Sequence, residues 1–316
     1  MSDQSRMYWI HALTPLHVGA GRGVGYIDLP ILREKVTNLP LVPGSAIKGV
    51  IADKHSATDE KRNTDPIFRA AFGISDPRGG ADAGANSGSL VFTDARLVCL
   101  PVRSLYGTFA WCTSPMILRR LHRDLEAAGL ANNLTVPADL TTPKTIHVAN
   151  NTSALKDTGG NVFLEDLDLK AAVCPKAAAW AEQLGNWLFA GNQAEDWRTT
   201  FTQRFAVVSD DVFAFLSETG TEVTARVRID DHQKTVAKGA LWYEESLPTE
   251  SILAGLVWCD RVFGPKANGQ SSADLLNKFC PCTSDGSTLQ IGGKATVGKG
   301  RVRCTFTASN SNGGQP

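Results

Sequence analysis

The sequence predicts an α+β fold with large loop insertions, for three reasons. Strand-like and helix-like segments alternate along the 316 residues. Long polar stretches rich in glycine, alanine and serine separate several of these segments. Hydrophobic residues make up 42% of the chain and charged residues 20%, as in ordinary globular proteins. A chain of this length can bury a substantial core, either as one domain with long insertions or as two small domains.

The N-terminal region is predicted to run from a strand through a long loop into a helix. Residues 7–13 have the apolar character of a strand, and a Thr-Pro pair ends it. A glycine-rich loop occupies residues 19–25. Residues 46–55 are predicted to be helical, with Ser45 near the N-cap.

Further strands and helices are expected along the rest of the chain. The small polar residues of 75–89 predict a surface loop, and the tail beyond residue 308 is predicted to be disordered. The punctuated polar segment 131–165 predicts an insertion of loops and short strands. The remaining elements that we expect are strands at 90–98 and 107–112 and helices at 115–129 and 171–188.

Composition also bears on location and on metal content. No apolar run approaches the roughly 18 residues of a membrane span, and the N-terminus lacks the order of a signal peptide. We therefore expect a soluble, cytoplasmic protein that does not contact a membrane. The seven cysteines are dispersed, and the close pair Cys280 and Cys282 lacks the spacing of a zinc site. Reduced, structural cysteines are the favoured interpretation.

The net charge is zero, because 32 basic residues balance 32 acidic ones. A basic field over the whole protein is therefore excluded, and any nucleic-acid site has to come from local segregation of charge. Three segments show such segregation.

The first segment is a glycine-rich basic stretch at residues 291–303. Gly292 and Gly293 precede Lys294, and Lys299 and Arg301 follow, with no acidic residue in the stretch. Glycines let backbone N–H groups approach a phosphate closely, and basic side chains neutralise it. A flexible basic hairpin loop without a partner is an equal alternative. The stretch runs into a half-buried strand, as the alternation of residues 301–306 predicts.

The second segment is the start of the predicted N-terminal helix. A helix N-terminus offers free N–H groups and the positive end of a dipole, so the turn at Ser45 could seat a phosphate. Lys48 lies one turn further and could reach back to the same anion. An ordinary capped helix is the alternative, and residue chemistry alone favours it.

The third segment is a predicted β-hairpin at residues 221–245. In its first arm, Thr224, Arg226 and Arg228 share one face, and apolar residues occupy the other. The return arm carries Trp242 and Tyr243 near the base of the hairpin. Such an element could wedge against nucleic-acid bases. A plain core hairpin with solvated arginines is an equal alternative.

Together these segments resemble the RAMP superfamily of CRISPR proteins. The stretch Gly-Gly-Lys-Ala-Thr-Val-Gly-Lys-Gly-Arg at residues 292–301 is similar to the glycine-rich loop of that superfamily, and residues 41–49 are similar to its first-helix motif. Two further segments, at 102–115 and 226–248, resemble a mid-chain signature and the thumb hairpin of the backbone subunit of type III-B (Cmr) complexes. The matches occur in order and span nearly the whole chain.

The resemblance implies a specific architecture and specific partners. The fold would be a single ferredoxin-like (RRM-like) palm over residues 1–308, with an insertion at about 131–170 and an inserted thumb hairpin at about 221–247. Residues 309–316 would form a disordered tail. Copies of the subunit would stack as a filament along a guide CRISPR RNA, together with other type III-B effector subunits. Each thumb would interrupt the duplex between the guide and a complementary target RNA.

The resemblance also implies a catalytic residue. In this superfamily an aspartate in the loop after the first strand is needed to cut target RNA, and Asp28 occupies that position. A carboxylate can act as a general base or hold a divalent metal, and the resemblance implies dependence on Mg²⁺ or Mn²⁺. The candidate helpers are His17, Lys48, Tyr243 and Glu244, and the candidate RNA-binding residues are Ser45, Lys48, Arg103, Arg226, Arg228, Gly292, Gly293, Lys294, Lys299 and Arg301.

Residue chemistry taken alone would place Asp28 in a turn or a cap. Four other interpretations therefore stay open. The chain could be a non-catalytic backbone subunit of the same filament or a backbone ribonuclease of a type III-A complex. It could also be a RAMP nuclease that processes precursor guide RNA or, more distantly, an α+β enzyme that binds phosphate.

Overall fold

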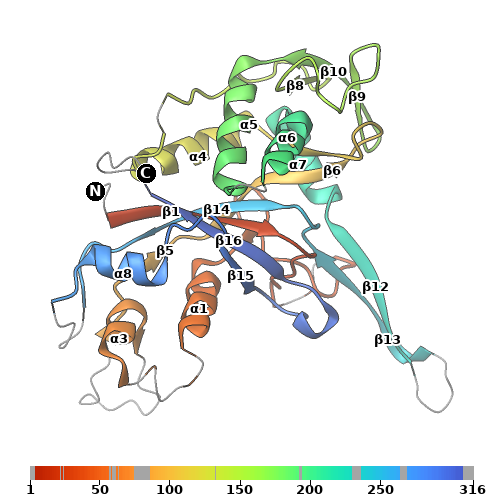
Figure 1. The fold of residues 1–316 in the computed structure, drawn as a ribbon. Helices are drawn as coiled ribbons and strands as arrows, with labels where there is room; N and C mark the ends of the chain where they lie inside the picture. The colour runs from red at the N-terminus through yellow and green to blue at the C-terminus, as the bar shows by residue number, and fades with distance from the viewer. Residues whose placement is uncertain are drawn as a thin grey trace.

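The structure is a computed structural model that describes residues 4–21, 23, 25–56, 58, 62, 64–74, 86–131, 133–191, 194–229, 236–263 and 269–308. Within this part of the chain, a large sheet of 12 strands carries helices on both faces (Figure 1). The predicted α+β class is confirmed. The predicted tail at 309–316, the tip of the hairpin and most of the loop at 75–89 lie outside the described residues.

The centre of the sheet is formed by four antiparallel strands. β1 (Ser5–Ala12) lies between β16 (Arg301–Thr307) and β14 (Ile252–Trp258), and β14 pairs on its other side with β6 (Ala95–Arg103). Helix α1 (Gly44–His55) lies between β1 and β6 in the sequence, and helix α8 (Ser272–Phe279) lies between β14 and β16. The C-terminal end of the glycine-rich basic loop, at the start of β16, is therefore fixed by this core of the sheet.

The sheet continues beyond the central strands in both directions. β15 (Ser287–Gln290) forms one edge beside β16. On the other side, β6 is followed by β7 (Phe109–Thr113), β11 (Phe205–Val207), β8 (Thr145–Val148), β10 (Leu167–Val173) and β9 (Asn161–Leu164). Shorter strands are β2 (Leu41–Val42) and β5 (Val91–Phe92) in the same sheet, and β3 (Gly73–Ile74) with β4 (Asn86–Ser87) in a separate pair.

The two faces of the sheet have separate hydrophobic cores. Side chains of β1 alternate between them, so Tyr8 and Ile10 belong to one core and Met7 and Trp9 to the other. Buried residues of α1, α3 (Pro66–Phe72) and α8 join the first core. Buried residues of α4 (Pro115–Ala127), α5 (Pro175–Leu188) and α6 (Glu195–Arg204) join the second, which is consistent with their placement in Figure 1.

The predicted hairpin is present and forms a sheet of its own. Helix α7 (Asp210–Thr219) leads into β12 (Glu222–Ile229), which pairs with β13 (Val236–Ser246); we call β12 and β13 the thumb. The thumb projects from the body of the molecule (Figure 1). Val223, Val227 and Ile229 are 38%, 45% and 49% exposed. The alternative of a plain core hairpin is therefore wrong, because the apolar face of β12 packs against no core.

Two boundaries differ from those predicted. The predicted helix at 171–188 begins only at Pro175, since residues up to Val173 pair with β8 as part of β10, and Pro175 is a favourable first helical residue. The predicted strand at 90–98 is split into β5 and β6 around Asp94. The helices expected at 46–55 and 115–129 are confirmed.

Two predictions from composition can be compared with the structure. All seven cysteines are free thiols, and five of them are buried, which confirms the structural interpretation. Among the described helices, none combines the length and the apolar character that crossing a membrane would require.

Two glycines of α1 provide a matched test of the packing between this helix and the sheet. A Cβ atom on Gly44 would lie 2.3 Å from the carbonyl oxygen of Phe92, whereas a Cβ on Gly49 would meet nothing within 4 Å. We expect Gly44→Ala to lower the free energy of unfolding by about 1–3 kcal/mol because the strand has to move. Gly49→Ala should raise it by up to about 1 kcal/mol through helix propensity. Urea unfolding of the purified chain measures both, and equal effects of the two substitutions would contradict this packing.

Candidate functional site

Three segments that are far apart in the sequence meet at the base of the thumb. They are the loop that follows β1, the last residues of β13 and the glycine-rich loop between β15 and β16. Leu16, in the first loop, forms a bridge with Leu247 just beyond β13. The Gly293 N–H donates a hydrogen bond to the carbonyl of His17 at 2.9 Å. The predicted catalytic loop, thumb base and basic loop therefore form one site.

The second half of the loop after β1 runs alongside β13. The Leu29 N–H donates to the carbonyl of Tyr243 at 3.0 Å, and the Glu245 N–H donates to the carbonyl of Leu29 at 3.0 Å. Leu29 thus forms a parallel bridge with Glu244, which lies between Tyr243 and Glu245. Because Asp28 immediately precedes Leu29, these bonds hold it beside the thumb.

Asp28 itself is exposed. Its Oδ2 atom accepts a hydrogen bond from the Tyr243 N–H at 2.8 Å. The ring of Tyr26, which is 73% exposed, meets the ring of Tyr243 edge-on with the centroids 6.2 Å apart. The carboxylate is therefore fixed by a backbone donor, faces solvent, and lies next to two tyrosine rings that are available for contact.

His17 is buried at the centre of the junction, with 6% of its surface exposed. Its Nδ1 atom lies 2.7 Å from the carbonyl oxygen of Glu245. A carbonyl can only accept a hydrogen bond, so Nδ1 carries a proton and donates to it. A Cβ on Gly19 would lie 3.2 Å from Nε2, which places that atom against the loop that carries Asp28.

Glu244 is buried among three cations. Its Oε1 atom lies 2.9 Å from Lys294 Nζ and accepts from the Trp242 indole at 2.8 Å. Its Oε2 atom lies 3.6 Å from Lys299 Nζ and 3.5 Å from Arg226 Nε. Burial alone would raise the pKa of Glu244, but the hydrogen bonds from Trp242 and Lys294 and the nearby positive charges lower it to about 2. The predicted helper is thus a permanent anion that binds the basic loop to the thumb.

The glycine-rich loop has a defined shape that depends on two glycines. Gly292 has a φ of 77° and Gly300 a φ of 84°, a region that glycine tolerates best. A Cβ at these positions would lie 2.2 Å from the His17 carbonyl oxygen and 2.1 Å from the Ile291 carbonyl oxygen, respectively. Lys299 Nζ also donates to the Ser246 hydroxyl at 2.7 Å. The loop is therefore anchored to the thumb base and to the loop after β1, and its binding of phosphate stays a prediction.

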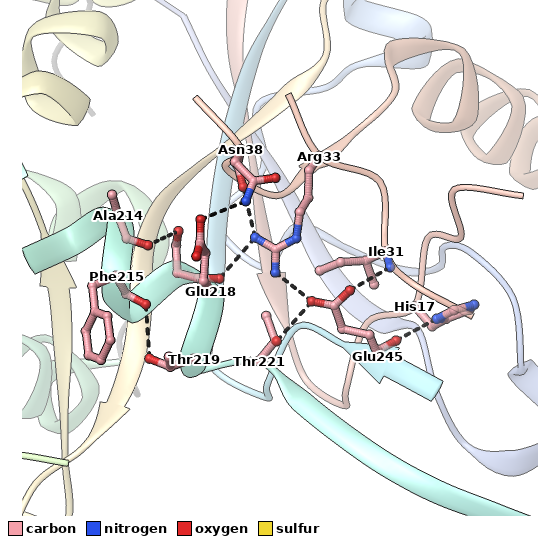
Figure 2. Close-up of polar contacts among 11 residues, drawn as sticks. His17, Ile31, Arg33, Asn38, Ala214, Phe215, Glu218, Thr219, Thr221 and Glu245 are labelled. Atoms are coloured by element: carbon pink, nitrogen blue, oxygen red, sulfur yellow. Dashed lines mark hydrogen bonds and ion pairs between the residues drawn. The ribbon is translucent and has the colours of Figure 1, made fainter. Parts of the chain in front are cut away.

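A second buried carboxylate, Glu245, lies next to Glu244 and has different partners. Its Oε1 atom is 2.6 Å from Arg33 Nη2 and accepts from the Thr221 hydroxyl at 3.0 Å, and its Oε2 atom accepts from the Ile31 N–H at 3.0 Å. Figure 2 shows these contacts beside the bond from His17 to the Glu245 carbonyl. This network joins the loop after β1 to the start of the thumb.

The predicted phosphate seat at the start of α1 already has an acidic partner within the protein. The Gly44 N–H donates to the Asp94 carboxylate at 2.9 Å, so a protein anion already occupies the helix N-terminus. Pro43 is the N-cap, and Ser45 is an exposed residue of the first turn. Lys48 donates to the carbonyl of Leu90 at 2.9 Å rather than reaching back along the helix, and burial lowers its pKa. No described contact brings Ser45 or Lys48 to Asp28.

The remaining candidate arginines are exposed and lie in different places. Arg228 belongs to the outer half of β12, and Arg301 begins β16 at the end of the glycine-rich loop. Arg103 ends β6, where the following residue bridges to β9. No contact in the described part of the chain joins Arg103 to the thumb base.

The residues around Asp28 fit only a metal ion that is largely held by water and substrate. Within the described ranges, no group of three or more His, Cys, Asp or Glu side chains could hold a metal. The nearby acids Glu244 and Glu245 are committed to basic partners. Mg²⁺ commonly keeps several waters and binds one or two carboxylates together with phosphate oxygens. Asp28 can supply one such ligand.

Comparison with known proteins identifies the family. The model of the RAMP superfamily matches residues 9–303. A relative from Pyrococcus furiosus named CRISPR system Cmr endoribonuclease Cmr4 is 34% identical over 311 residues, which cover 96% of both chains. The chain belongs to the Cmr4 family of the RAMP superfamily. The resemblance seen in the sequence motifs is confirmed.

Other members of this family agree over nearly the full length. A Saccharolobus solfataricus protein named CRISPR system CMR subunit Cmr4 is 24% identical over 93% of this chain and 94% of its own. The crystal structure of oligomeric Cmr4 from Pyrococcus furiosus superposes with a TM-score of 0.68 at 27% identity, covering 98% and 99% of the two chains. A chain of the type III-B Cmr-beta complex bound to cognate target RNA shares the fold, with a TM-score of 0.66 at 19% identity over 96% of each chain.

Sequence reasoning missed Arg33, Asp94 and Glu245. Glu245 directly follows the candidates Tyr243 and Glu244, but its sequence neighbours do not show which residue it pairs with. The alternation of side chains along a strand was the available signal, because it sends neighbouring residues to opposite faces. Arg33 lies 212 positions from Glu245, so their pairing leaves no local pattern.

The low pKa of Glu244 predicts a specific dependence of stability on pH. The folded-state value of about 2 lies below the ordinary value of 4.5, so its contribution is complete above pH 4.5 and is lost as the pH falls towards 2. The shift corresponds to on the order of 3 kcal/mol. We expect Glu244→Gln to be less stable than wild type at pH 6, with a difference that narrows below pH 4.5. Urea unfolding of both proteins between pH 6 and pH 3 measures this.

Glu222 on the same thumb provides the control. Burial raises its pKa, so wild type should gain stability relative to Glu222→Gln as the pH falls, whereas it should lose stability relative to Glu244→Gln. A Glu244→Gln difference that stays constant over this pH range would show that the carboxylate is not held ionised by the basic loop.

Proposed function

We propose that this chain is the backbone subunit of a type III-B CRISPR effector complex and cleaves target RNA complementary to a bound guide RNA. Copies of the chain stack along the guide, together with the other subunits of the complex, in the cytoplasm. The near full-length similarity to a relative named as a Cmr endoribonuclease supports the assignment. The observation that carries it is the exposed Asp28 carboxylate at the junction of the thumb and the basic loop.

The palm of this subunit is the ferredoxin-like unit β1-α1-β6-β14-α8-β16. Support comes from the strand order β16-β1-β14-β6, in which every neighbouring pair is antiparallel, and from a helix in each of the two crossovers. The thumb is inserted between β6 and β14, and its base returns to the loop after β1. This arrangement would place cleavage at the edge of the palm rather than on its open face.

The proposed reaction needs no nucleophile from the protein. The 2′-oxygen of the target ribose attacks the adjacent phosphorus, and the bond to the 5′-oxygen breaks as that oxygen takes a proton from solvent. The products are a 2′,3′-cyclic phosphate and a 5′-hydroxyl. Asp28 accepts the proton of the attacking hydroxyl as a general base or acts as a metal ligand. A bound Mg²⁺ or Mn²⁺ would neutralise charge on the phosphate oxygens. The Tyr243 N–H orients the carboxylate in either case.

The other residues at the junction bind and orient. The side chains of Lys294 and Arg226 are 33% and 38% exposed, and each forms an ion pair with Glu244. They are therefore preorganised to bind RNA phosphates. His17 keeps its proton on Nδ1 and supports the loop through the Glu245 carbonyl. The exposed rings of Tyr26 and Tyr243 offer stacking surfaces for bases.

The role of Asp28 is tested by Asp28→Asn in the assembled complex. We expect cleavage of guide-complementary RNA to fall at least a hundredfold, because the amide can neither accept the proton nor bind a metal ion well. Binding of guide and target should persist, since the amide oxygen can still accept the Tyr243 N–H bond. Single-turnover cleavage and filter binding measure the two properties, and wild-type complex should give fragments of constant spacing.

The control for this variant is Asp166→Asn, which removes an exposed carboxylate in the turn between β9 and β10. It should cleave at the wild-type rate. Undiminished cleavage by Asp28→Asn would instead support a non-catalytic backbone subunit.

Metal dependence is tested separately by chelation. We expect EDTA to stop cleavage by wild-type complex and Mg²⁺ or Mn²⁺ to restore it, because Asp28 supplies only one of the ligands that a bound ion needs. Duplex formation with the target, measured by filter binding, should continue in EDTA. Full cleavage rates after chelation would assign Asp28 the role of general base without a metal.

A further inference from the structure

We infer that Glu245, paired with Arg33, is the positioning residue of the cleavage site: it holds both sides of the Asp28 loop against the thumb. This inference rests on the proposed function. Glu245 is not placed to touch RNA, because its side chain is only 4% exposed. Its effect on the reaction passes through the residues that it fixes.

The first part of the argument is that Glu245 contacts the loop on both sides of Asp28. Before Asp28, the His17 ring donates to the Glu245 carbonyl at 2.7 Å. After it, the Glu245 N–H donates to the Leu29 carbonyl, and the Glu245 carboxylate accepts from the Ile31 N–H, both at 3.0 Å. One residue of β13 therefore bonds to the loop on both sides of Asp28.

The second part concerns the path from Glu245 to the reacting carboxylate. Leu29 directly follows Asp28, and its N–H donates to the Tyr243 carbonyl at 3.0 Å. The Tyr243 N–H in turn donates to Asp28 Oδ2 at 2.8 Å. Both bonds require the loop to stay in register with β13. The hydrogen bond from the Ile31 N–H to the Glu245 carboxylate holds this register two residues beyond Leu29.

The third part is the ionic anchor. Arg33 Nη2 lies 2.6 Å from Glu245 Oε1, and Arg33 is 15% exposed. Arg33 Nη1 also donates to the carbonyl of Ser217, near the end of α7, at 3.1 Å, and Thr221 donates to Glu245 at the start of the thumb. As Figure 2 shows, the pair gathers the loop, the end of α7 and the thumb base around one carboxylate. A neutral side chain would hold these segments much more weakly.

A positioning residue should affect the rate of cleavage and leave target affinity unchanged. Misplacing a reacting group by about 1 Å can cost about a hundredfold in rate. We expect Glu245→Gln and Arg33→Lys to lower the single-turnover cleavage rate of the assembled complex at least tenfold at saturating target RNA. The dissociation constant for target RNA should stay within about twofold of wild type, since the phosphate-binding cations lie on the other side of β13.

Arg33→Lys is included because it keeps the buried charge and changes only the forked geometry, so it tests the inference even if Glu245→Gln fails to fold. Hydrogen exchange of the purified chain provides a readout besides activity. The amides of Leu29 and Ile31 should exchange faster in Arg33→Lys than in wild type. Glu218→Gln removes a charge near the pair and leaves an amide oxygen that can still accept the hydrogen bond from Asn38, so it should change neither exchange nor rate.

The outcomes separate this inference from the proposed function. If Asp28→Asn cleaves normally, the proposed function fails, and Glu245 has no reaction to position. If Asp28→Asn is inactive while Arg33→Lys and any folded Glu245→Gln cleave at the wild-type rate, this inference alone is overturned. Parallel losses of rate and of target affinity would also overturn it, because they would assign the pair a general structural role.

Discussion

The buried ion pair between Arg33 and Glu245 is the interaction on which the arrangement of the site depends. Moving a carboxylate and a guanidinium out of water costs several kcal/mol for each ion unless their remaining donors and acceptors are satisfied. Here the carboxylate has three donors, and the guanidinium also donates to two backbone carbonyls. Removing either partner would leave a buried charge unpaired, at a cost of about 3–5 kcal/mol. The thumb base and the loop therefore behave as one unit.

The same strand supports the opposite side of the site through the preceding residue. Neighbouring side chains of a strand point to opposite faces, so Glu244 reaches the basic loop while Glu245 reaches the loop after β1. Glu244 carries one negative charge among three positive ones, which leaves the thumb base electropositive. A chain with no net charge thus concentrates positive charge locally. Both adjacent glutamates are committed to basic side chains.

Much of the fold and part of the site could be predicted from the sequence. The strand at the N-terminus, the helix after it, the hairpin and the half-buried strand at the C-terminus all have local patterns of the correct period. The start of the helix after β10 was misplaced because alanines fit either element, and pairing with β8 decided the matter. The order of the central strands could not be predicted from the residues, since no local pattern specifies which strands become neighbours.

Several charged residues near the site have partners that are distant in the sequence. The start of α1 has the features of an anion site, and one of its N–H groups donates to the side chain of Asp94, which lies between β5 and β6 about 50 residues away. Long-range pairing likewise decides that Lys48 faces Leu90 and that Glu245 faces Arg33. Charged residues can be found in a sequence, but their partners depend on topology. Asp28 was found through the family motif, whereas the residues that hold it could be found only in the structure.

The composition of the site suggests why its geometry has to be fixed so firmly. Asp28 is exposed and has a single described donor, His17 uses its proton to hold the loop, and Glu244 is committed to the basic loop. If the proposed function is correct, the protein contributes little chemistry beyond one carboxylate, and the RNA supplies the nucleophile and the remaining ligands. The rate then depends mainly on where that carboxylate lies relative to the target backbone. A loop held on both sides by one buried ion pair meets this requirement without placing any further reactive group next to the RNA.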